Sequence, residues 1–161
     1  MATPAHLFIP APRAPEEVGS AAPARPAPAR PSAPPPAPNA VVLLEQARTR
    51  LREAAAAHRA TERCVHAHLA ALRAATAVVV ERSWRRVARP CARVPGSVWR
   101  QLAEVAPELR EWADHFAAGS LRRAAAEAGS SAITPGEAEL CLRHATEFVE
   151  VVERSLPGAA R

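Results

Sequence analysis

Apolar residues recur at helical spacing along most of this chain after residue 38. The clearest stripe alternates steps of four and three residues, which predicts a helix over about 61–82; it consists of Val65, Leu69, Leu72, Thr76 and Val79. Similar spacing predicts further helices over about 40–57, 98–105, 107–128 and 135–154. Since no segment alternates like a strand, the fold class is predicted to be all-α, a bundle of four or five helices.

Residues with capping chemistry stand where several of these helices should begin. Asn39, Thr61 and Ser97 are candidate N-caps, because their side chains can accept a hydrogen bond from the first-turn backbone. Two other signals are a capping box, Thr134-Pro135-Gly136-Glu137, and Pro107 in the first turn of the fourth helix. Gly129 is expected to end that fourth helix.

Proline separates the chain into an arm and a body. Twelve of the 17 prolines lie in residues 1–38, so this segment is predicted to be disordered or extended polyproline II. Residues 39–156 are predicted to form the bundle and residues 157–161 a short tail. Much of the 48% hydrophobic content is alanine, which favours helix but buries little area. The aromatic residues Trp99, Trp112 and Phe116 are therefore expected in the core rather than under nucleic-acid bases.

Charge is distributed unevenly along the chain. All 21 basic residues are arginine, as expected for a GC-rich genome, so arginine abundance alone says little. Residues 39–100 carry twelve Arg against four Glu, whereas residues 101–161 carry six Arg against ten acids. A basic half next to an acidic half suggests a surface for polyanions, complementarity between two copies, or two ordinary solvated surfaces.

Cysteine usage and hydropathy point to a cytoplasmic protein without cofactors. Cys64, Cys91 and Cys141 are odd in number and lack the spacing of metal ligands, which fits a reduced compartment. The N-terminus lacks the apolar segment of a signal peptide, and no segment is expected to approach the roughly 18 apolar residues of a membrane span.

The candidate chemistry lies in Arg63-Cys64-Val65-His66-Ala67-His68. A guanidinium can grip a phosphate with two hydrogen bonds, and an imidazole can move protons near neutral pH. Arg63 and His68 are thus candidate catalytic residues for metal-free attack on a phosphodiester. In a regular helix they differ by roughly 140° and do not share a face. A site built from two chains, each giving one arginine and one histidine, removes this difficulty.

His66 and Arg73 are candidate binding residues on the same helix. Glu62 and His66 are four residues apart, which fits a salt-bridged surface pair or half of a metal site. His66 and His68 lie about 200° apart, so they cannot chelate one ion on a regular helix. No metal site, catalytic Ser/His/Asp arrangement or glycine-rich phosphate loop is therefore predicted.

Three segments of the chain resemble HEPN domains (higher eukaryotes and prokaryotes nucleotide-binding), in particular a branch from GC-rich actinobacteria. The first is Arg63-x4-His68 with the following LAALRAA. The second runs from Val98-Trp99 through VAPEL, EWA, FAAG and RAAAEAG. The third contains EAEL, ATEF and VVE, so that the resemblance covers about 40–154.

This resemblance implies a helical bundle that is commonly a dimer with the motif helices facing each other. In active HEPN members the motif cleaves RNA without metal, which implies His68 as the base for a ribose 2′-hydroxyl and Arg63 as the holder of the scissile phosphate. Cys64 departs from the aromatic residue expected after the arginine. An RNA- or nucleotide-binding module with endoribonuclease activity, a non-catalytic adaptor for a protein partner, and a regulator of DNA transactions all remain open.

Overall fold

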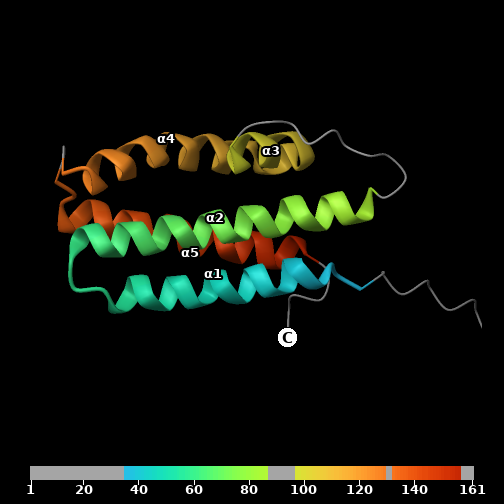
Figure 1. The fold of residues 1–161 in the computed structure, drawn as a ribbon, viewed down its shortest axis with the longest axis horizontal. Helices are drawn as coiled ribbons and strands as arrows, with labels where there is room; N and C mark the ends of the chain where they lie inside the picture. Colours follow the sequence, from blue (N-terminus) through green and yellow to red (C-terminus); the bar gives the residue numbers. More distant parts are fainter. Residues whose placement is uncertain (1–34, 87–96, 130–131, 157–161) are drawn as a thin grey trace, which may run out of the picture. The chain divides into compact units, whose positions relative to one another are not determined.

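The computed structural model describes residues 35–86, 97–129 and 132–156 (Figure 1). They form α1 (Pro38–Ala56), α2 (Ala60–Arg85), α3 (Val98–Val105), α4 (Arg110–Glu127) and α5 (Pro135–Ser155), with a short 3-10 helix at Pro107–Leu109. No strand occurs within these residues, and the predicted all-α bundle is confirmed. The predicted arm up to residue 34, the predicted tail at 157–161 and Cys91 lie outside the described residues.

The central element of the bundle is α2. It packs most extensively against α1 and α5, and α3 and α4 also lie against it (Figure 1). Most of its buried positions are alanine, namely Ala67, Ala70, Ala71, Ala74, Ala75 and Ala77. Because the distance between packed helices depends on the side chains at the contact, these small residues let the neighbouring helices approach closely.

The composition of α2 also meets the length and hydropathy of a membrane span. The expectation that no segment approaches such a span is thus wrong for this helix. However, 56% of its most apolar window is buried inside the bundle. Packing against the other helices accounts for its apolar character.

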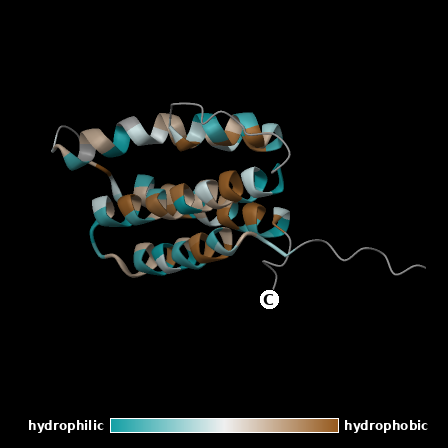
Figure 2. Cartoon of the chain, turned by 45° about the vertical axis from the view of Figure 1, so that its right-hand side comes forward, coloured by the Kyte–Doolittle hydropathy of each residue, from teal (hydrophilic) through white to brown (hydrophobic). Residues whose placement is uncertain are grey.

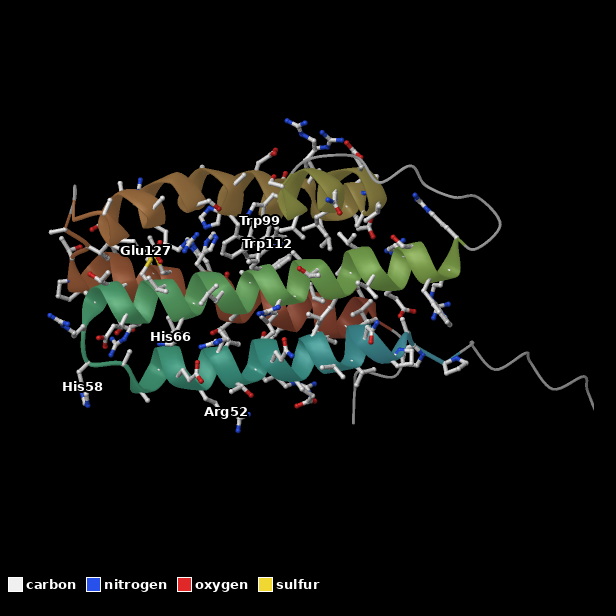
Figure 3. The ribbon with its side chains drawn as sticks, in the orientation of Figure 1. Arg52, His58, His66, Trp99, Trp112 and Glu127 are labelled. Carbon is white, nitrogen blue, oxygen red and sulfur yellow. The ribbon has the colours of Figure 1, made fainter. Side chains whose placement is uncertain are left out.

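A cluster of aromatic rings joins α3, α4 and α5. Phe116 lies at its centre, with ring centroids 5.2 Å from Trp99 and 5.3 Å from Phe148. Trp112 stacks on the same Phe116 ring, and both tryptophans lie on the inner side of the α3–α4 layer (Figure 3). Outside this cluster α4 has mainly pale and polar residues (Figure 2). The predicted core role of the aromatic residues is confirmed.

Ion pairs connect the basic half of the chain to the acidic half. Arg48 Nε lies 2.7 Å from Glu153, and Arg82 pairs with Glu108. A third pair joins Arg63 to Glu139. Part of the charge asymmetry in the sequence is therefore compensated within a single chain.

Several predicted helix signals are confirmed in the structure. The Ser97 hydroxyl accepts a hydrogen bond from Arg100 N, and Thr134 and Glu137 form the predicted capping box. Pro107 opens the 3-10 turn that leads into α4. Gly129, just after α4, has φ of +72°, a conformation that glycine adopts without the penalty paid by other residues.

Two predicted N-caps, Asn39 and Thr61, are wrong because each lies inside its helix. Helix α1 begins at Pro38, and the N–H of Ala37 donates to Glu81 Oε2 of α2 at 2.7 Å. A carboxylate at a helix N-terminus accepts from an otherwise unpaired backbone N–H and interacts favourably with the positive end of the helix dipole. Helix α2 begins at Ala60, before Thr61, and Arg63 N already bonds to Arg59 O.

Glu81 is almost completely buried, with 1% of its surface exposed, and its second oxygen accepts from Arg85 Nε at 2.6 Å. Replacing it by alanine leaves the Ala37 N–H without its partner. We expect Glu81→Ala to lower the free energy of unfolding by about 3 kcal/mol in urea titrations. Glu150→Ala, which removes an exposed α5 partner of Arg154, should change it by no more than about 0.5 kcal/mol. Equal losses would contradict a special role of Glu81.

Candidate functional site

Arg63 lies in the first turn of α2 and points toward the connection between α1 and α2. Its Nη2 donates to the carbonyl of Ala57 at 2.8 Å, and Nη1 pairs with Glu139 of α5. The Nε atom is buried and has no hydrogen-bond partner among the described residues. The side chain thus reaches round the helix end, but its charged atoms hold the connection and α5 together.

His68 lies on another side of α2, among α3 and α4. It is buried, with 7% of its surface exposed, and its ring packs edge-on against Trp99 and Phe116. The pKa of His68 is lowered from its ordinary value of 6.5 to about 4, mainly by burial and also by the charge of Arg123, while the charge of Glu127 opposes the shift. The imidazole is therefore neutral at physiological pH.

The hydrogen bonds of the Ser120 hydroxyl determine which ring nitrogen of His68 carries the proton. Ser120 Oγ donates to the carbonyl of Phe116 at 2.9 Å and accepts from Trp99 Nε1 at 3.2 Å. Since its single proton is used, the 3.1 Å contact with His68 Nε2 requires that Nε2 be the donor. Nδ1 is then unprotonated and has no hydrogen-bond partner among the described residues, so it can accept a proton.

His66 and Arg73 lie elsewhere on α2. His66 points toward α1, on the side opposite Trp99 and Trp112 (Figure 3), where Nδ1 is 3.2 Å from Glu53 and 3.5 Å from Arg50. Arg73 is exposed and borders a shallow groove along α1 that also includes Arg50 and Glu53. The structure thus separates the two candidate binding residues from His68.

A cavity of about 220 Å³ opens between α2, α4 and α5, and His68 forms part of its wall. Residues that can carry positive charge dominate its polar lining. The lining consists of Cys64 and His68 from α2; His115, Phe116, Ala118, Gly119, Arg122 and Arg123 from α4; Ile133; and Glu137, Leu140, Cys141 and His144 from α5. Arg63 is not in this lining.

Each guanidinium group of the cavity has one carboxylate partner. Arg122 lies 3.9 Å from Glu137, whose carboxylate is also held by Thr134 in the capping box; this hydrogen bonding lowers the pKa of Glu137. Arg123 pairs with Glu127 through Nη1 at 2.9 Å. Its Nε is buried and, like that of Arg63, has no partner among the residues described. The fixed charges on this wall thus include two guanidinium groups beside one cavity carboxylate.

Two histidines face each other at the same cavity. His115 Nε2 and His144 Nδ1 are 3.0 Å apart. Burial, and then the proximity of His144, lower the pKa of His115 from its ordinary value. Where the structure describes the chain, no three potential ligands are grouped so as to hold a metal ion.

Sequence reasoning found His68 but missed the other cavity residues. His115, Gly119 and Arg122 follow one another at steps of four and three on α4, and Glu137, Cys141 and His144 do so on α5. Each set shares one helix face. These two stripes could have indicated a site between α4 and α5, but the predictions made from the sequence relied on the apolar stripes.

The geometry defines an all-α bundle with a cavity beside the motif helix that two arginines and three histidines line. The family model for SAV_6107-like HEPN matches residues 54–153, more than half of the 161 residues. The chain therefore belongs to the HEPN family. No match is found among the curated proteins or among the solved structures.

Burial of His68 should make stability depend on pH. Because its folded pKa of about 4 is below 6.5, the unfolded chain binds more protons between these values. The contribution of neutral His68 to the free energy of unfolding is complete above pH 6.5. It is lost as the pH falls toward 4, and the total loss is roughly 3 kcal/mol. In urea titrations at pH 6.5 and pH 4, the free energy of unfolding of His68→Gln should therefore fall less between the two pH values than that of the wild type.

His58→Gln is the matched control, because His58 is exposed and points away from the bundle (Figure 3). It should retain the pH dependence of the wild type. If His68→Gln and His58→Gln behave alike, burial does not control the protonation of His68.

Proposed function

We propose that this protein is an RNA- or nucleotide-binding HEPN module that holds a phosphate group in the cavity between α2, α4 and α5. The observation that carries the proposal is the convergence of Arg122, Arg123 and three histidines on one cavity. Membership in the family supports this general class of ligand. Homodimerisation and a cytoplasmic location stay predictions.

The chemistry of the lining suits a phosphate. A guanidinium presents several N–H donors in a planar fork that matches phosphate oxygens. Arg123 retains a buried Nε donor without a partner among the described residues, while Glu137 is occupied by its cap. A phosphate would satisfy that donor and would compete with Glu137 for the guanidinium of Arg122.

Single-stranded RNA binding should therefore depend on the α4 arginines. We expect Arg123→Gln to weaken binding about tenfold in fluorescence anisotropy with a short labelled RNA, since one charge-assisted contact is lost. The slope of log affinity against log salt should fall by about 0.7 for each lost phosphate contact.

Arg52→Gln removes the same charge from α1, where the side chain points away from the bundle (Figure 3). It should change the affinity by less than about twofold. Equal losses in the two variants would indicate diffuse attraction to the surface and would exclude the cavity as the binding site.

We further propose that His68 can act as the base in metal-independent RNA cleavage. Its free Nδ1 would take the proton of a ribose 2′-hydroxyl. The 2′-oxygen then forms a bond to phosphorus, and the bond from phosphorus to the 5′-oxygen breaks. Water protonates the leaving oxygen, and the hydroxide that remains takes the proton back from His68. The products are a 2′,3′-cyclic phosphate and a 5′-hydroxyl. Within one chain Arg63 is held by Ala57 and Glu139, so its role beside His68 would require a second copy, whereas the charge of Arg123 reaches His68 within one chain.

A cleavage assay in EDTA tests this chemistry. We expect wild-type protein to produce 2′,3′-cyclic phosphate ends, and His68→Ala to reduce the rate by about 100-fold, the usual contribution of a general base. Arg123→Ala should slow cleavage more than Arg63→Ala does if the site lies within one chain. The opposite order would favour a site shared between two copies. Intact RNA after incubation with the wild type would refute the catalytic proposal.

A non-catalytic adaptor is the second candidate. Its support is exposed apolar surface, because Trp84 is 58% exposed and Val42 is 54% exposed. Tryptophan is enriched at the centre of protein interfaces. Absence of RNA binding by the wild type would favour this function, with a protein partner instead of a nucleic acid.

A further inference from the structure

Cys64 of α2 and Cys141 of α5 form a close pair of thiols. Their sulfur atoms lie 2.6 Å apart, although 77 positions separate the residues in the sequence. Both cysteines are free. A disulfide has a sulfur–sulfur distance of about 2.05 Å, so the bond can form with little movement of the two helices.

The cavity gives small molecules access to both thiols, since both cysteines belong to its lining. Arg122 lies on the same wall and favours a thiolate. The hydrogen bond between the thiols lowers the pKa of Cys141 to about 7, and it raises that of Cys64, as does burial. The thiolate is the reactive form of cysteine. Cys141 is therefore suited to react first with an oxidant, and Cys64 to attack the oxidised Cys141 sulfur.

We propose that Cys64 and Cys141 are a peroxide-sensitive modification site that closes reversibly to an intrachain disulfide. The Cys141 thiolate attacks one oxygen of hydrogen peroxide, the O–O bond breaks, and a sulfenic acid and hydroxide form. The Cys64 sulfur then attacks the Cys141 sulfur, the S–O bond breaks, and the departing hydroxide takes up a proton as water. Two thiols and one peroxide thus give one disulfide and two waters, and a thiol reductant reverses the change.

The crosslink would connect α2 to α5 at the wall of the cavity. Both helices are already packed on each other, so the bond restrains an arrangement that the reduced protein has. The site is defined by the thiols themselves and does not depend on RNA binding or cleavage. It adds a chemical state of the cavity that the family does not imply.

The full-length protein should be treated with hydrogen peroxide, alkylated and digested with trypsin, which cleaves after arginine. We expect alkylatable thiols to fall from three to one and mass spectrometry to find residues 64–73 linked to residues 124–143. Dithiothreitol should restore all three thiols. The oxidised form should melt about 10 °C higher than the reduced form, because the crosslink closes a long loop.

Cys91→Ser is the matched control and should retain the crosslink, with its alkylatable thiols falling from two to none. Cys64→Ser and Cys141→Ser should each lose the crosslinked peptide. In each variant, peroxide should oxidise the remaining thiols about tenfold more slowly. Circular dichroism checks that the variants are folded. The peptide map of the wild type tests the proposal even if a variant does not fold. A disulfide through Cys91, or oxidation of Cys141 to sulfinic acid without a crosslink, would overturn the proposal.

Discussion

Close packing around α2 is the constraint on which the rest of this structure depends. Its buried positions are mostly alanine, so four other helices can pack against it, but each alanine contributes little buried apolar area. The large side chains that fill the core therefore come mainly from its neighbours, as in the cluster around Phe116 and Phe148. His68 is an exception on α2, and its ring completes the edge of this aromatic cluster. The candidate base is thus also part of the core.

That double role explains the chemistry of His68. Burial against aromatic rings removes water from the imidazole and keeps it neutral, while Ser120 orients it. A base with a low pKa is available at neutral pH, but it has a weaker thermodynamic pull on a proton than one near pH 7. Charge stabilisation by arginine must supply more of any catalysis. In the proposed reaction that contribution falls to Arg123, whose charge acts on His68.

Local patterns predicted most of the fold, because helical periodicity and caps depend on neighbours in the sequence. Ser97, the Thr134 capping box and Gly129 act through residues within the same turn. Asn39 is not the cap because α1 begins one residue earlier, at Pro38, where the N–H of Ala37 donates to Glu81, a buried carboxylate 44 positions from Ala37. Likewise, helical geometry correctly separated Arg63 from His68 by direction. It could not identify the arginine that does lie near His68, because that depends on how α4 packs on α2.

The charge pattern shows why segment averages fail for the site. The basic charge of residues 39–100 left a surface for polyanions as one of three alternatives, yet Arg48, Arg63 and Arg82 pair with glutamates of the acidic half. The cavity arginines, Arg122 and Arg123, come instead from residues 101–161, which carry net negative charge. Electrostatic attraction at a few ångströms depends on which charges share a wall and how much water separates them. A net charge summed over sixty residues carries neither property, so two arginines from the acidic half of the chain can line one cavity.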